Sequence, residues 1–190
     1  MKIGILAIQG DFEAHRKVLE PLGADVTLVK SASDLAGIDG LVLPGGESTT
    51  HLKLLTEEDM LAPLADRAGH GMAVFGTCAG AILLAKEVKN PPQASLGLID
   101  MTVVRNAYGR QLESCVLEGV TDFGGHPVEM VFIRAPQIER VGPGVQVLAR
   151  RDGKPVLVRQ ERALAATFHP ELTDDPTIHS YFLKMVANGK

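Results

Sequence analysis

A cysteine between two glycines is the first candidate for chemistry in this 190-residue chain. Cys78 lies in the run Gly-Thr-Cys-Ala-Gly at residues 76–80, where a predicted buried strand at residues 72–75 passes directly into a predicted helix at residues 79–86. Such a turn holds a nucleophile in strained backbone between small neighbours, and the start of the helix offers N–H groups that favour a thiolate. The pattern therefore predicts a catalytic thiol, with a small buried hydrophobe as the alternative.

A histidine late in the chain is the candidate base for this thiol. Of the six histidines, only His169 stands at the end of a predicted buried strand, at residues 164–168. Glu171 follows two residues later, and in extended backbone such residues point to the same side, so that ring and carboxylate can meet. The carboxylate would fix the tautomer of the ring and stabilise the imidazolium. With Cys78 these residues predict a nucleophile, base and orienting group, whereas Glu171 alone could be a solvated loop charge.

A glycine-rich loop, Pro-Gly-Gly-Glu-Ser at residues 44–48, follows another predicted strand. Because parallel sheets bind ligands at the carboxyl ends of their strands, we expect this loop near the Cys78 turn. Its backbone N–H groups, together with that of Ala79, could form an oxyanion hole. The loop alone is equally compatible with a plain glycine turn into a helix capped by Ser48.

The remaining polar candidates give weaker evidence of a function. Residues 105–111, Arg-Asn-Ala-Tyr-Gly-Arg-Gln, predict either a solvated loop or a clamp for a substrate carboxylate, since arginine suits bidentate recognition. Cys115 lacks glycine flanks and is expected to pack, and His15 and His179 lie on predicted helices and are expected at the surface or an interface. Cysteines and histidines do not cluster at the spacing of metal ligands, so no metal site is predicted.

Composition restricts the class of function. Hydrophobic residues make up 45% of the chain, which is enough apolar material for a core. Aromatic residues are only 4% and the net charge is -4, so we expect no nucleic-acid partner and no membrane surface. Two cysteines cannot form a disulfide framework, and no targeting or membrane-spanning stretch is evident. These observations predict a soluble, cytoplasmic protein.

The candidate residues must be positioned by a sheet. In the first half, predicted strands alternate with helices, which favours βαβ units: strands at residues 2–8, 25–30, 41–43 and 72–75, helices at 12–22, 49–55, 57–68 and 79–86. Asp11 is a candidate cap of the first helix, and Gly23 is expected to end it. The second half predicts strands at 98–105, 112–117, 128–134, 145–151, 155–160 and 164–168, a hairpin turn at 151–154 and a closing helix at 176–187. We therefore predict an α/β fold in one domain over residues 1–190, with a mostly parallel central sheet flanked by helices and an antiparallel extension in the second half.

Several segments, in their order along the chain, resemble class I glutamine amidotransferases and more narrowly the glutaminases of pyridoxal 5'-phosphate synthases. The glycine-flanked cysteine and the late His-x-Glu are shared across amidotransferases. The loop Pro-Gly-Gly-Glu-Ser-Thr-Thr, the stretch at residues 105–111 and Ile-Arg-Ala-Pro at residues 133–136 are specific to the narrower group. The segments that carry the resemblance are residues 7–11, 44–50, 76–80, 105–111, 132–136 and 168–171.

The resemblance implies a role for each matching residue. Cys78 would attack the side-chain amide of L-glutamine, His169 would serve as base and then as acid to the leaving ammonia, and Glu171 would orient His169. The backbone of Gly46 and Ala79 would hold the tetrahedral oxyanion. Arg105 would bind the substrate carboxylate, and no cofactor is implied. The implied glutamine pocket consists of Gly46, Glu47, Ser48, Arg105, Ile133 and Arg134.

The resemblance also implies a partner. In the family, the ammonia passes to a separate synthase subunit that makes pyridoxal 5'-phosphate (vitamin B6 biosynthesis) from ribose 5-phosphate and glyceraldehyde 3-phosphate. The family assembly is a hetero-oligomer of twelve synthase and twelve glutaminase subunits. Chemistry favours such a partner, because ammonia released into neutral water becomes ammonium, which is not a nucleophile.

Three other interpretations stay open at this point. The chain could be a stand-alone cysteine hydrolase or peptidase on the same scaffold. It could be a non-enzymatic protein whose glycine-flanked cysteine senses oxidation. It could also be a glutaminase that serves a different synthase, although residues 105–111 and 133–136 argue against this through resemblance.

Overall fold

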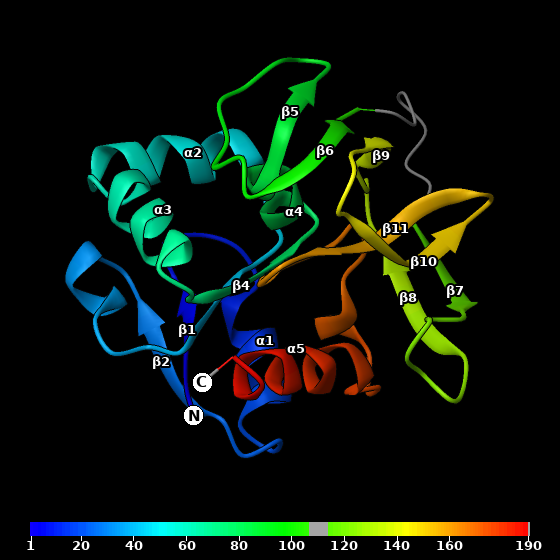
Figure 1. Ribbon diagram of the computed structural model, residues 1–190, viewed down its shortest axis with the longest axis horizontal. Coiled ribbons are helices and arrows are strands. Elements are labelled where there is room, and N and C mark those ends of the chain that lie inside the picture. Colours follow the sequence, from blue (N-terminus) through cyan, green and yellow to red (C-terminus); the bar gives the residue numbers. More distant parts are fainter. Residues whose placement is uncertain (107–113, 190) are drawn as a thin grey trace.

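A seven-stranded sheet runs through the middle of the protein, whose computed structural model describes residues 1–106 and 114–189 (Figure 1). The strand order is β10-β11-β12-β4-β3-β1-β2. Five neighbouring strands are parallel: β12 (Ala163–Ala166), β4 (Ala73–Thr77), β3 (Gly40–Leu43), β1 (Lys2–Leu6) and β2 (Asp25–Val29). At one edge β11 (Lys154–Gln160) and β10 (Gln146–Arg151) are antiparallel and joined by the hairpin predicted at residues 151–154. The predicted sheet, mostly parallel with an antiparallel extension, is confirmed.

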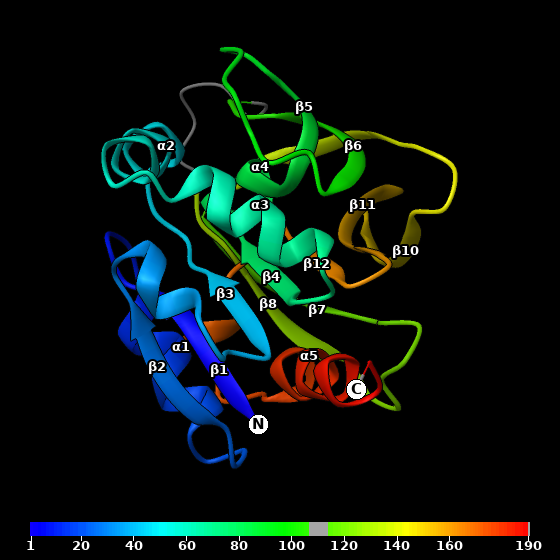
Figure 2. The same cartoon turned by 60° about the vertical axis from the view of Figure 1, so that its left-hand side comes forward.

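Helices cover both faces of this sheet (Figure 2). Helices α1 (Phe12–Leu19) and α5 (Thr177–Ala187) lie on one face, and α2 (Ser48–Glu57), α3 (Leu61–Gly69) and α4 (Ala79–Leu84) lie on the other. Side chains alternate along each strand, so that Leu41 and Leu43 of β3 join the apolar core under α2 to α4, while Val42 joins the core under α1 and α5. Because both of their faces are buried, β12, β4, β3 and β1 are mostly apolar in sequence, whereas the edge strand β2 begins with an exposed Asp25.

Two smaller sheets carry much of the second half. Strands β5 (Ala85–Lys89), β6 (Ile99–Val104) and β9 (Gln137–Val141) form one, and β7 (Cys115–Gly119) and β8 (Val128–Phe132) form an antiparallel pair. Two short 3₁₀ helices, η1 (Ala32–Leu35) and η2 (Pro170–Leu172), complete the description.

Several predicted boundaries are wrong. The helix predicted over residues 79–86 ends at Leu84, because the chain turns there into β5, where buried Ala85 and Val88 enclose two exposed charged residues. The first helix ends at Leu19, before Gly23, which lies in a turn with a φ of 83°. Strand β9 was not predicted, and of the strand predicted at residues 112–117, residues 112 and 113 lie outside the described part.

Within residues 1–106 and 114–189, we find no helix that combines the length and the apolarity needed to cross a membrane.

Candidate active site

Cys78 occupies a strained turn between β4 and α4. Its φ is 47° and its ψ is −102°, in the half of backbone space that residues other than glycine rarely adopt. The Cys78 N–H donates to the carbonyl oxygen of Ala166 on the neighbouring strand β12 at 2.9 Å. A Cβ atom on Gly80 would lie 2.0 Å from the Leu43 carbonyl oxygen, and one on Gly76 would lie 2.5 Å from the backbone of Gly80. The predicted elbow is thus present, and close backbone packing requires both of its glycines.

His169 and Glu171 follow the strand next to β4. The His169 N–H donates to the Val131 carbonyl oxygen of β8 at 2.8 Å, which fixes the backbone at the end of this segment. His169 Nδ1 lies 2.8 Å from Glu171 Oε1, and both side chains are buried. Glu171 lies in the 3₁₀ helix η2 rather than in extended backbone, so the two side chains meet through a tight turn and not through strand alternation.

The charges of these groups stabilise one another. Burial by itself would lower the pKa of His169, but hydrogen bonds with Cys78 and Glu171 outweigh burial and raise it to about 10. Burial would raise the pKa of Glu171, but the imidazoles of His15 and His169 outweigh burial and lower it. The arrangement therefore favours a protonated His169 beside an ionised Glu171.

The glycine-rich loop lies against the imidazole ring. A Cβ atom on Gly45 would be 2.4 Å from Cε1 of His169, so only glycine allows this approach. Gly46 has a φ of 141°, and a Cβ atom there would be 2.6 Å from the Gln9 side-chain nitrogen. Gly10, with a φ of 92°, packs so closely that its Cβ would be 1.9 Å from the Gly45 carbonyl oxygen. The loops after β1 and β3 thus meet beside the triad candidates.

A pocket of about 260 Å³ opens at the sulfur of Cys78. Its lining brings together most of the predicted site residues, namely Gly46, Glu47, Ser48, Cys78, Arg105, Ile133, Arg134 and His169. Two predicted residues, Ala79 and Glu171, are not part of this lining. Asp11, Ile82 and Pro136 line it as well, without a predicted binding role, and so does Asn106 of the predicted clamp. Ile82 could have been found, because it lies one helical turn after Cys78.

Arg105 reaches this pocket beside the start of α2. Its Nη2 lies 3.3 Å from Glu47 Oε1, and its Nη1 is buried without a hydrogen-bond partner among the described residues. Glu47, not Ser48, is the N-cap of α2, since its carboxylate accepts the N–H groups of Thr49 and Thr50. Burial would raise the pKa of Glu47, but the hydrogen bonds of the two threonines outweigh burial and lower it to about 2. Glu47 therefore holds the helix and the arginine together.

Two further details concern the predicted pocket. The Ser48 hydroxyl donates to Gln93 Oε1 at 3.0 Å, so this side chain is already engaged. Of the polar stretch at residues 105–111, only Arg105 and Asn106 are described, and residues 107–111 lie outside the described part of the chain. The predicted clamp is therefore represented by its first arginine.

The prediction that His15 and His179 lie at the surface or an interface is wrong. Both are completely buried, and His15 Nδ1 lies 3.0 Å from His179 Nε2. His15 Nε2 lies 3.6 Å from Glu171 Oε2.

The Asp11 side chain makes no capping hydrogen bond at the start of α1, although the residue holds the N-cap position.

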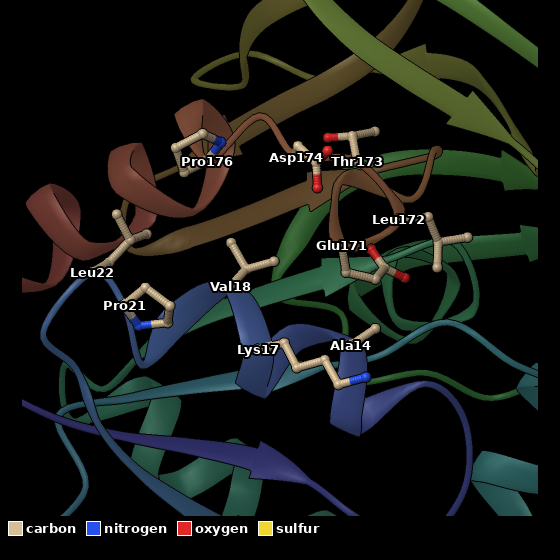
Figure 3. Close-up of a pocket in the computed structure, with 10 residues that line it drawn as sticks. All are labelled: Ala14, Lys17, Val18, Pro21, Leu22, Glu171, Leu172, Thr173, Asp174 and Pro176. Atoms are coloured by element: carbon tan, nitrogen blue, oxygen red, sulfur yellow. The ribbon is translucent and has the colours of Figure 1, made fainter.

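No group of three or more potential metal ligands occurs within residues 1–106 and 114–189. A separate hollow of about 560 Å³ lies between α1 and residues 171–176, and it touches Glu171 but neither Cys78 nor His169 (Figure 3).

Comparison with known proteins gives concordant results. Residues 5–188 match the model of the SNO glutamine amidotransferase family. "Pyridoxal 5'-phosphate synthase subunit PdxT" of Koribacter versatilis is 58% identical, over 100% of this chain and 97% of its own length. The protein of the same name from Thermotoga maritima is 51% identical, over 98% of this chain and 100% of its own length. A solved structure described as a glutamine amidotransferase superimposes with a TM-score of 0.92 at 46% identity, covering 97% of this chain and 98% of that chain.

Proposed function

The chain belongs to the SNO glutamine amidotransferase family, and from this premise we propose that it hydrolyses L-glutamine to L-glutamate and ammonia as the glutaminase subunit of a pyridoxal 5'-phosphate synthase. The observation that carries the proposal is one pocket lined by both Cys78 and His169, together with the 2.8 Å distance from His169 Nδ1 to Glu171 Oε1. The name shared by the relatives favours this synthase over others.

The first half-reaction forms a thioester. The Cys78 thiolate adds to the side-chain carbonyl carbon of glutamine, and the carbonyl oxygen becomes an oxyanion, for which the N–H groups of Gly46 and Ala79 are the proposed donors. His169 then gives its proton to the amide nitrogen, the C–N bond breaks, and ammonia leaves. Glu171 keeps the ring oriented and stabilises its positive charge.

The second half-reaction uses the same imidazole as a base. The pKa of His169 is high because Cys78 and Glu171 hydrogen-bond to it, and the anionic sulfur is consumed when the thioester forms. The pKa of His169 in the acyl enzyme is therefore lower, and the neutral ring can take a proton from water. The resulting hydroxide attacks the thioester carbonyl and the C–S bond breaks, which restores the thiolate beside the now protonated His169. The new γ-carboxyl group gives its proton to solvent, and glutamate leaves.

Recognition of glutamine is assigned to the pocket at Cys78. Arg105, whose Nη1 has no partner among the described residues, supplies the fork for the α-carboxylate. Glu47 is committed to capping α2, so in this proposal it acts by holding Arg105 rather than by direct contact alone. Ile133, Arg134, Ser48 and Gly46 also line this pocket.

The acceptor of the ammonia is proposed to be a separate synthase subunit. Ammonium forms quickly in water at neutral pH, so a glutaminase is useful only when its product reaches an acceptor before it is protonated. The family assembly of twelve synthase and twelve glutaminase subunits is the arrangement we propose for this chain as well. We expect low activity of the isolated chain, because the Gly45–Gly46 peptide can turn its N–H away from the oxyanion.

The test combines labelling with turnover. Incubation with a diazo-ketone analogue of glutamine should modify Cys78 alone, as read by peptide mass spectrometry, and glutamate release should rise when the synthase subunit is added. The variant Cys115→Ser should be labelled like the wild type, while Cys78→Ser should not be labelled. Modification of Cys115, or of neither cysteine, would contradict the glutaminase assignment. Equal rates of glutamate release with and without the synthase would remove the proposed partner.

A further inference from the structure

Behind the triad candidates lies a group of polar side chains that is closed to water. His15 of α1, Thr77 at the end of β4 and His179 of α5 are fully buried, and Glu171 is 5% exposed. These four residues come from four different elements, and the ring of Phe75 packs edge-on against both imidazoles, with centroids 6.3 and 5.8 Å away. Burial of two imidazoles at one place is costly unless their nitrogens are paired.

The contacts form a chain that ends on the carboxylate. His179 Nε2 lies 3.0 Å from His15 Nδ1, and His15 Nε2 lies 3.2 Å from the Thr77 hydroxyl and 3.6 Å from Glu171 Oε2. Glu171 Oε1 is occupied by His169, whereas Glu171 Oε2 has no hydrogen-bond partner among the described residues. His15 is therefore the donor group nearest to the second oxygen of Glu171 for which the structure gives a contact.

The positions of the protons follow from the two ends of this series of contacts, His179 and the Glu171 carboxylate. Burial, the largest effect, lowers the pKa values of His15 and His179, so each ring is neutral near pH 7 and carries one N–H. If His15 carries its proton on Nε2, that N–H faces Thr77 and Glu171, and Nδ1 accepts the N–H of His179. In the opposite tautomer, a nitrogen lone pair of His15 faces the carboxylate, and His179 Nδ1–H is a buried donor without a partner among the described residues. The first tautomer is therefore favoured.

We propose that His15 is a positioning residue of the triad, whose Nε2–H holds Glu171 from the side opposite to His169, and that His179 fixes the tautomer of His15. The proposal deepens the proposed function and rests on it. Helix α1 thus has two roles: Ala14, Lys17 and Val18 line the hollow of Figure 3, while His15 points inward to the carboxylate.

The consequence concerns the basicity of His169. His169 holds Glu171 Oε1 by a hydrogen bond, and the Nε2–H of His15, 3.6 Å from Oε2, attracts the other oxygen electrostatically. A carboxylate restrained from both sides stays aligned with His169 Nδ1 and stabilises the imidazolium. If His15 is lost, Glu171 has one contact fewer and can turn away. His169 then holds its proton less tightly. The groups that face His15 are Glu171, His169, Asp11 and His179.

The first experiment compares His15→Leu with Leu19→Ala in the full chain with its synthase subunit. Leu19 is buried on the same helix but belongs to the apolar core, so its variant controls for a loosened α1. For His15→Leu we expect kcat to fall about 10- to 100-fold with KM within about twofold. The alkaline limb of the pH profile should move to lower pH by about half a unit or more. His15→Gln, which retains a side-chain N–H, should recover much of kcat.

Loss of the same size in His15→Leu and Leu19→Ala, or an unmoved pH profile, would overturn the proposal. If the wild type hydrolyses no glutamine, the proposed function fails. The positioning role of His15 is then tested by the alkylation of Cys78 and by the histidine spectra. The pH dependence of Cys78 alkylation by iodoacetamide should shift in His15→Leu and not in Leu19→Ala. Nitrogen-15 spectra of labelled histidines should show His15 and His179 as neutral Nε2–H tautomers at pH 7. A Nδ1–H or protonated His15 would refute the proposed role of His15.

Discussion

The buried ring of His179 makes the folded protein sensitive to acid. Burial and the nearby His15 lower the pKa of His179 to about 3, whereas an unfolded histidine titrates near 6.5. For a base with a lowered pKa, the stabilising contribution is complete above the unfolded value and is lost as the pH falls toward the folded value. The free energy of unfolding should therefore decline below about pH 6.5, by about 1.4 kcal/mol per pH unit for this one proton.

The variant His179→Leu isolates this contribution. Its free energy of unfolding, measured by urea denaturation between pH 7 and pH 4, should decline less steeply than that of the wild type, by about 1.4 kcal/mol per pH unit. His70→Leu is the matched control for loss of an imidazole, since the side chain of His70 is 74% exposed. If the slopes of all three proteins coincide, His179 is not held neutral by the fold.

At this scale, the sequence permits prediction of some site residues and not of others. Cys78 and His169 could be predicted because each stands at the end of an apolar run, and local pattern reports that position. His15 and His179 could not, because they meet across 164 positions of sequence and a histidine on a helix gives no sign of its burial. Glu47 escaped as a helix cap because the rule that favours serine at this position pointed one residue too far.

The turn between β4 and α4 depends on the backbone of β3. Gly80→Ala would place a Cβ atom 2.0 Å from the Leu43 carbonyl oxygen, and neither backbone segment can give way without moving the sheet or the helix. We expect a loss of about 3 kcal/mol or more in the free energy of unfolding. Calorimetry or urea denaturation measures this loss.

Gly69→Ala is the control for this helix-glycine substitution. Gly69 ends α3, and a Cβ atom there meets no other atom within 4 Å. It should leave stability within about 1 kcal/mol of the wild type, on the stabilising side. If the loss of stability in Gly80→Ala were as small as that expected for Gly69→Ala, the elbow would tolerate a methyl group at Gly80, and this glycine would serve another purpose.

Elements were predictable where burial is symmetric. The parallel strands β1, β3 and β4 are covered on both faces, so their sequences are continuous apolar runs that indicate strands. Strands β5 and β9 belong to a small sheet with exposed positions, and their charged residues hide the pattern. The split of the second half into separate sheets depends on contacts between distant segments, which periodicity does not report.

At the scale of the whole molecule, the site is formed by segments that follow the carboxyl ends of the parallel strands. Gln9 follows β1, the glycine loop follows β3, Cys78 follows β4 and His169 follows β12, which is why residues far apart in sequence meet there. The Gln9 carbonyl oxygen is 2.9 Å from Nε2 of His51, so this loop is also tied to α2. A partner that contacts residues 9–11 would therefore act on Gly46 through direct packing.

If a synthase subunit activates the chain as proposed, this coupling predicts the route of activation. Removal of the Gln9 amide, which packs against Gly46, should reduce the ratio of glutaminase rates with and without saturating synthase by about 5-fold or more. Gln9→Ala should be compared with Gln137→Ala, whose side chain lies outside the pocket and accepts from Lys154 at 2.8 Å. Titration calorimetry separates a weaker complex from a less active one. An unchanged ratio in Gln9→Ala at saturation would show that activation reaches Gly46 from another face of the molecule.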